Sequence, residues 1–303
     1  MSAGSIVAVA SVNLAVALLL SPLLEGVMRK LKAALHSRKG PPVIQPYLDL
    51  AKLLGKEDLR SAPGRLYALT PALTLGAVAA LALLVPMGGP PPLAGAGDII
   101  VLLYVATASA VLLVLTALAG RGAYGAVGSS REIMVLLSVE PVLAVALVVG
   151  AVKAKTLALD GILAWQVGHG PTISMAVAGV AFFLALQAQV GKLPFDVAEA
   201  DQEIMGGPLI EQGGPRLALF RWALWTKQLV LALLLVELFA PWPRSGVLAI
   251  DLALALVKAL VVLVLVAVVD TVNPRLKVEQ TMGYFMRVAF SSLAALAFAV
   301  IGM

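Results

Sequence analysis

Eight apolar stretches, each about 20 residues long, divide this chain of 303 residues. A helix needs roughly 20 mainly apolar residues to cross about 30 Å of hydrocarbon, so each stretch predicts a transmembrane helix. The predicted spans are about 5–24, 66–86, 98–119, 132–152, 172–191, 216–240, 246–269 and 281–301. They predict an all-α polytopic membrane protein, with residues 1–303 forming a single transmembrane domain.

A further helix is predicted in the long polar connection between the first two spans. Gly40-Pro41-Pro42 interrupts the chain there. The apolar residues that follow recur near one helical face: Ile44, Tyr47, Leu48, Leu50 and Leu54. Lys52, Lys56 and Arg60 add positive charge to this face or beside it. The pattern is typical of an amphipathic helix that lies at the cytoplasmic membrane surface or docks a partner helix.

The composition supports a membrane protein and excludes several kinds of site. Mean hydropathy is +0.99 and 61% of the residues are hydrophobic, which excludes an ordinary soluble domain. The chain has no cysteine, so it cannot by itself build a disulfide or bind an iron–sulfur cluster through thiolates. Its two histidines, His36 and His169, fall in predicted loops on opposite sides of the membrane. We therefore expect no metal site and no cofactor within this chain.

The positive charges are divided unequally between the two sides of the predicted bundle. Sixteen lysines and arginines fall in or beside the loops on one side, against three on the other: Lys153, Lys155 and Arg244. Because cytoplasmic loops are enriched in Lys and Arg, both termini are predicted to face outward. The net charge of +5 then reflects membrane topology rather than nucleic-acid binding.

An acidic segment, residues 191–211, follows the fifth predicted span. It holds five carboxylates: Asp196, Glu199, Asp201, Glu203 and Glu211. Pro194 suits a first helical turn and Gly206-Gly207-Pro208 would end the helix, which places Asp196, Glu199 and Glu203 on one face with Asp201 opposite. Like charges held together titrate as a coupled set. A solvated acidic loop is the alternative, but the long apolar runs on both sides favour a functional cluster.

Four ionisable residues within or at the ends of spans are candidates for ion coupling, because charges at membrane depth are costly. Glu140 lies in the middle of the fourth span before Pro141, and Glu132 lies two turns earlier. Lys227 lies within the sixth span, and Asp270 closes the seventh at its inner end. Structural ion pairs between helices are the alternative interpretation. For Glu140 and Lys227 a role in ion coupling is favoured over a structural ion pair, because neither residue lies near the end of its predicted span.

Four motifs occur in an order that is specific to one family. They are Arg38-Lys-Gly-Pro41 with Gln45-Pro46, Arg131 through Ser138 to Glu140, Pro194-Phe-Asp-Val-Ala-Glu-Ala-Asp-Gln-Glu203 through Glu211, and Asn273-Pro-Arg-Leu-Lys-Val-Glu-Gln280. In these motifs the chain resembles the NADH dehydrogenase subunit 1 family. This is the membrane subunit shared by respiratory complex I and the energy-converting NiFe hydrogenases, including formate hydrogenlyase. The resemblance extends over all eight predicted spans.

The resemblance implies a membrane anchor and coupling subunit of an ion-translocating redox complex in a prokaryotic cell membrane. Its partners would be soluble hydrogenase-like large and small subunits, antiporter-like membrane subunits and lipid. Iron–sulfur clusters and a NiFe centre would belong to those partners. The resemblance also implies two sets of residues: proton-relay groups at Glu140, Asp196, Glu199, Glu203 and Glu211, and groups that tune them or dock a partner at Arg38, Arg121, Arg131 and Arg275. The basic residues Lys52 and Lys56 are predicted to join the docking set.

Departures from the complex I pattern favour the hydrogenase branch. The segment Gly40-Pro-Pro-Val-Ile-Gln-Pro46 is compact where complex I versions carry an insertion. Val139 replaces the Tyr of a Ser-Tyr-Glu motif, and Val135 stands where a Gln is expected. Both changes weaken the case for a quinone site. A quinone-site subunit of a complex I-type dehydrogenase, a subunit of a sulfur-reducing or ferredoxin-oxidising complex, and a freestanding secondary transporter remain alternatives.

Overall fold

The computed structural model describes residues 3–62, 64–93, 97–120 and 122–302, which form an all-α bundle, as predicted. Eight of its helices correspond to the eight predicted spans: α1 (Ala3–Leu35), α3 (Arg65–Leu84), α4 (Ile99–Gly120), α5 (Ala123–Ala154), α7 (Ile173–Gln189), α9 (Gly214–Phe239), α10 (Leu248–Val272) and α11 (Val278–Ile301). In the described ranges seven of these are long and apolar enough to cross a membrane, and α7 is a shorter apolar helix. The prediction of eight full-length spans is therefore approximate.

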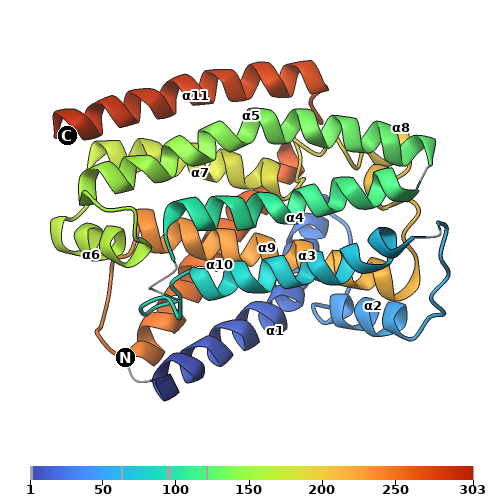
Figure 1. The fold of residues 1–303 in the computed structure, drawn as a ribbon, viewed down its shortest axis with the longest axis horizontal. Helices are drawn as coiled ribbons and strands as arrows, with labels where there is room; N and C mark the ends of the chain where they lie inside the picture. The colour runs from blue at the N-terminus through green and yellow to red at the C-terminus, as the bar shows by residue number, and fades with distance from the viewer. Residues whose placement is uncertain (1–2, 63, 94–96, 121, 303) are drawn as a thin grey trace.

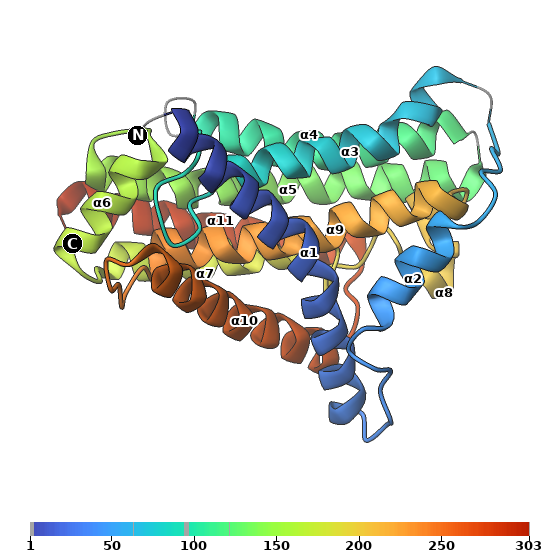
Figure 2. The ribbon, with the colours of Figure 1, turned by 90° about the horizontal axis from the view of Figure 1, so that it is seen from below.

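The two termini lie at the same end of the bundle in both views (Figures 1 and 2). Two short helices mark the opposite end: α2 (Gln45–Leu54) and α8 (Asp201–Ile204). A small helix that the sequence did not predict, α6 (Leu159–His169), lies at the end with the termini. We call the end that carries α2 and α8 the α2 end.

The central helix of the bundle is α9. Within its most apolar window 78% of the residues are buried, against 22–50% in the other long helices. It packs against α1, α3, α7 and α10, and α2 also lies against it. A helix surrounded in this way is shielded from lipid, so it can carry polar side chains that a lipid-facing helix could not.

The amphipathic helix is confirmed, and its apolar residues differ in burial. Leu50 is buried against Ala218 and Trp225 of α9, whereas Leu48 is 52% exposed. Ile44 and Leu54 are exposed as well. Part of the predicted apolar face therefore packs against α9, and the rest is exposed.

The helix predicted from Pro194 does not form. Residues 190–200 are turns and irregular backbone, followed by the four-residue α8 and a 3₁₀ turn, η1 (Gly207–Leu209). The backbone of this segment bonds to other elements: Leu193 N–H donates to Asp270 at 3.0 Å and Pro194 C=O accepts from Leu276 at 2.9 Å. The Phe195 ring packs within 4.7 Å of the ring of Phe285, centroid to centroid. The Pro194 carbonyl thus bonds to Leu276 instead of to an N–H group of its own helix, and the other contacts hold the segment in its irregular path.

Candidate functional site

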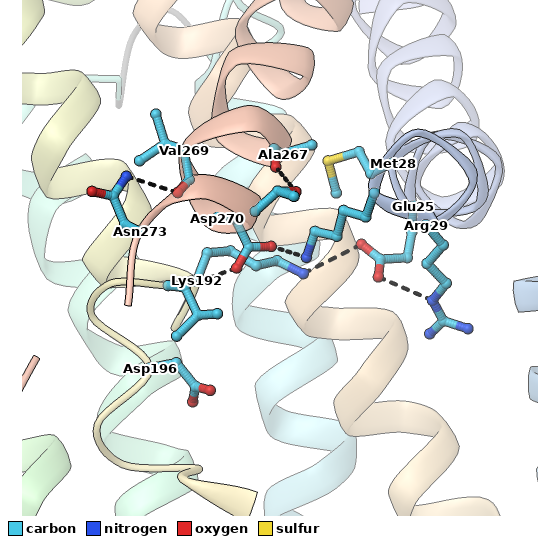
Figure 3. Close-up of polar contacts among 12 residues, drawn as sticks. Glu25, Met28, Arg29, Lys192, Asp196, Ala267, Val269, Asp270 and Asn273 are labelled. Atoms are coloured by element: carbon cyan, nitrogen blue, oxygen red, sulfur yellow. Dashed lines mark hydrogen bonds and ion pairs between the residues drawn. The ribbon is translucent and has the colours of Figure 1, made fainter. Parts of the chain in front are cut away.

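A group of charged side chains, the inner charge network, joins α1 to its neighbours (Figure 3). Glu25 of α1 accepts a hydrogen bond from Arg29 at 3.2 Å and one from Lys192 at 3.4 Å. Arg29 also donates to Asp49 of α2 at 3.0 Å. Burial alone would raise the pKa of Asp49, but the hydrogen bonds from Gln45 and Arg29 hold it below its usual range. These pairs tie α1 to α2 and to the acidic segment.

The same network continues to α10 through the predicted coupling residue Asp270. Its carboxylate forms an ion pair with Lys32 of α1 and accepts from Leu193 N–H (Figure 3). Asp270 is 6% exposed, so water screens the pair only weakly. The network thus connects α1, α2, α10 and the acidic segment.

The acidic segment does not present its carboxylates on a common face. Asp196 pairs with Arg275 at 2.6 Å, and Glu203 pairs with Arg131 at 2.7 Å. Hydrogen bonding and charge from Arg131 hold the pKa of Glu203 below its usual range. The predicted shared face was wrong, because the segment is not helical around Asp196 and Glu199. Two of the four arginines that were predicted to tune the cluster or dock a partner, Arg131 and Arg275, contact it.

Glu211 lies apart from the other acidic residues, in a narrow site beside the start of α5. Its carboxylate occupies the space that a Cβ atom at Gly120 or Gly122 would need. Ser61 Oγ donates to Glu211 Oε2 at 3.2 Å, and Tyr67 O–H donates to the Glu211 carbonyl at 2.8 Å. The glycine-rich turn before α5 therefore makes room for a carboxylate.

A second contact holds the connection between α1 and α3 to α9. Arg216, which is only 5% exposed, donates through Nε to Asp58 Oδ1 at 2.7 Å and through Nη2 to Oδ2 at 3.3 Å. Its guanidinium also lies over the Tyr67 ring, 5.2 Å from the centroid. The hydrogen bond from Arg216 is the main cause that holds the pKa of Asp58 below its usual range.

The buried centre of the site lies between α5, α7 and α9. Lys227 is 2% exposed, and its Nζ donates to Gln189 Oε1 at 2.9 Å. Glu132 and Glu140 both lie within electrostatic range of this ammonium group. Glu140 Oε1 is buried and has no hydrogen-bond partner among the described residues. Three of the predicted coupling residues therefore share one polar region inside the bundle.

A series of cavities leads from the α2 end toward this centre. The first, of about 400 Å³, is lined by Glu25, Lys192 and Glu199 among others. Glu199 also lines a small cavity of about 20 Å³, together with Asp196, Glu132 and Gln189. Glu132 and Gln189 in turn line a third cavity of about 20 Å³ that reaches Lys227. Each small cavity is large enough for about one water molecule.

The remaining predicted residues lie outside this region or outside the described chain. Arg38, Lys52 and Lys56 are exposed at the α2 end. Arg121 lies outside the described residues, and so does the side chain of Asp201. In the described ranges no group of three or more His, Asp or Glu side chains is placed to hold a metal ion.

Sequence reasoning missed three side chains that organise the site. Glu25 follows the predicted first span directly, and its spacing of four residues from Arg29 is the signal that could have identified it. Gln189 is a polar residue near the end of a predicted span. Arg216 was counted only among the sixteen basic residues that set the predicted orientation. Its contact with Asp58 joins positions 158 residues apart, which no local pattern reveals.

Residues 7–301 match the protein family described as NADH dehydrogenase. The chain belongs to this family. It is 34% identical to formate hydrogenlyase subunit 4 of Escherichia coli (strain K12) over 274 residues, which cover 86% of this chain and 88% of that protein. It is 33% identical to hydrogenase-4 component C of the same strain, with coverage of 90% and 89%.

A solved structure shows the same architecture. One chain of the membrane-bound sulfane sulfur reductase, an archaeal respiratory membrane complex, superimposes with a TM-score of 0.88 at 25% identity, covering 97% of this chain and 99% of that chain. Together with the two hydrogenase subunits, it confirms the resemblance found in the four sequence motifs. This chain is homologous to subunits of multisubunit membrane complexes.

Proposed function

We propose that this protein is the membrane anchor and coupling subunit of an ion-translocating redox complex of the membrane-bound hydrogenase type. The observation that carries the proposal is the series of three neighbouring cavities, linked by shared ionisable lining residues, from the inner charge network to Lys227. A charge change at the α2 end alters the electrostatic potential at Asp196 and Glu199. These residues line the same cavity as Glu132, which lies close to Lys227.

The redox chemistry belongs to soluble partners docked at the α2 end, where Arg38, Lys52 and Lys56 are exposed. Hydrogenase-like large and small subunits would carry the iron–sulfur clusters and the NiFe centre. Antiporter-like membrane subunits would carry ions alongside this chain. Names of the relatives support this arrangement, since two are hydrogenase or formate hydrogenlyase components.

A quinone-binding role in a complex I-type enzyme is the second candidate, and the cavity of about 400 Å³ is the observation that favours it. Its lining carries the charged residues Glu25, Arg29, Lys192, Glu199 and Arg221. Sites for apolar ligands are lined mainly by hydrophobic and aromatic side chains, so this lining suits water better than a quinone. Quinone-dependent electron transfer by the purified complex would favour the second candidate instead.

We propose an orientation with both termini outside and the α2 end in the cytoplasm, in agreement with the excess of basic residues in the loops at that end. The test uses single cysteines in this cysteine-free chain, at Ser37 for the α2 end and at Ser245 for the opposite end. A membrane-impermeant thiol reagent added to intact cells should label the cysteine at 245 alone. Labelling at position 37 would reverse the orientation.

Docking is tested by reversing three exposed charges, with Lys52, Lys56 and Arg60 all changed to Glu. The variant should remain in the membrane but lose the soluble redox subunits when the complex is purified through a tag on this chain. Reversal of Lys153 and Lys155, at the opposite end, is the control and should leave the subunits bound. If the basic face binds only anionic lipid, the triple variant will keep its soluble subunits, which would contradict the docking proposal.

A further inference from the structure

Arg287 occupies an unusual position on the last helix. It is the tenth residue of α11, about 13 Å along the helix axis from Val278. Its side chain is exposed, and its neighbours Met286 and Phe290 are 65% and 66% exposed. A guanidinium therefore lies on the outer face of a membrane helix among large apolar side chains.

Two other cations of the long helices find partners inside the chain. Lys227 bonds to Gln189, and Lys258 donates to the carbonyls of Ala240 and Pro241 at 3.0 Å. Within the part of the chain that the structure describes, the one hydrogen bond of Arg287 runs from Nε to the Gly283 carbonyl of its own helix, at 3.2 Å. Among the described residues no carboxylate forms an ion pair with it. Charges within membrane spans almost always pair, so Arg287 requires a partner from outside this chain.

The surface on either side of Arg287 suits close contact with another helix. Gly283, Ser291 and Ala294 are exposed and fall on the same face as Arg287, one to two turns away. A Cβ atom added at Gly283 would meet no atom of this chain within 4 Å, so nothing within the described chain covers it. Small residues at such positions let helix backbones approach each other in a membrane.

We propose that this face of α11 binds a transmembrane helix of a neighbouring membrane subunit, and that this helix presents an Asp or Glu carboxylate to Arg287. The proposal rests on membership of a complex, as proposed above. A carboxylate satisfies both the charge and the planar hydrogen-bonding geometry of the guanidinium, which a neutral helix does not. The small residues place the partner backbone close enough for a short acidic side chain to reach.

The experiment starts from the intact complex, purified through this chain with a photoreactive amino acid at Ser291. Irradiation should join this chain to a membrane subunit, at a helix that contains an Asp or Glu within its apolar segment. The matched control carries the same amino acid at Leu265, an exposed residue of α10, and should not capture that helix. Cross-links to lipid alone would overturn the proposal and indicate that Arg287 extends to a phospholipid phosphate.

Two further variants test the charge and the close approach separately. Arg287→Leu inserts at least as readily as the wild type, and it should lower the yield of the captured subunit about tenfold. Arg287→Lys keeps the charge but loses the planar geometry, so its yield should fall between those of Arg287→Leu and the wild type. Gly283→Leu should also reduce that yield, while Gly76→Leu, at an equally open glycine of α3, should not. Wild-type yield in both Arg287→Leu and Gly283→Leu would overturn the proposal.

The experiments on Arg287 can fail without contradicting the proposed function. A complex that keeps its soluble subunits but does not respond to Arg287→Leu contradicts this inference alone. A chain that purifies without any partner contradicts the proposed function itself.

Discussion

Lys227 and Gln189 form a hydrogen bond of 2.9 Å between two buried side chains from different helices, α9 and α7. Within the described chain no carboxylate lies close enough to Lys227 to form an ion pair. The Lys227 ammonium group is buried and hydrogen-bonded to a neutral amide, so no anion among the described residues balances its charge by direct contact. The electric field of carboxylates farther away therefore acts strongly on it. This arrangement places Lys227 where it responds to the charge of Glu132 and Glu140.

The contact predicts a specific effect of Gln189→Leu. Loss of the acceptor leaves the Lys227 ammonium buried without that bond, which should destabilise the protein by about 1–3 kcal/mol. Thermal unfolding of the purified complex measures the loss. Gln187→Leu is the matched control, because both polar atoms of Gln187 are buried and lack partners among the described residues. That control should be neutral or stabilising, and a larger loss in the control than in Gln189→Leu would contradict the account.

The Glu211 site predicts that Gly122→Ala displaces the Glu211 side chain. The new Cβ atom would occupy the space of the carboxylate, which must then move and lose its hydrogen bond from Ser61, so stability of the inserted protein should fall by about 1 kcal/mol. Glu211→Ala removes the conflicting atoms, and the double variant should recover much of the loss. Additive losses in the double variant would show that the two residues do not compete for this space.

Asp58 and Arg216 predict a defined dependence on pH. Because the folded pKa of Asp58 is lowered, its contribution to stability is fully present above the unfolded pKa of about 3.9 and is lost as the pH falls through the folded value. Asp58→Asn should therefore lower the thermal midpoint by a constant amount from pH 8 to about pH 5. The difference from wild type should shrink below about pH 4. A difference that widens toward low pH would contradict the assignment.

Glu203 should contribute less to ion coupling than its place in the acidic segment suggests. Its side chain is 55% exposed and pairs with Arg131 at the surface, whereas Glu132 lines both small cavities. We expect Glu203→Gln to keep more than half of the ion transport per electron in proteoliposomes, and Glu132→Gln to lose most of it. Equal losses would mean that the route passes through Glu203.

The hydrophobic pattern was sufficient for the fold class, the order of the spans and the position of α2, since these depend on local composition. It placed the end of the first helix about ten residues too early. Glu25, Arg29 and Lys32 lower the apparent hydropathy there, yet each finds an opposite charge in the folded chain, so α1 continues to Leu35. Such pairing depends on distant residues and cannot be derived from a local window.

The candidate site was predictable in part. Glu132, Glu140 and Lys227 were identified because charge is rare within apolar spans, and the structure brings them together. The geometry of the acidic segment was not predictable, because the Pro194 carbonyl, which a helix starting there would have bonded internally, accepts from Leu276 instead, and Leu193 N–H donates to Asp270. The contact of Glu211 with Gly122 likewise depends on tertiary packing.

Carboxylates inside the membrane are proposed to couple redox chemistry to ion movement, and Glu140→Gln tests this most directly. The change keeps size and hydrogen bonding but removes the titrating group. The measurement is the number of ions transported per electron by the intact complex in proteoliposomes, with electron transfer recorded in the same sample. We expect assembly and electron transfer to persist while transport per electron falls strongly. Normal transport per electron in Glu140→Gln would contradict the proposed coupling.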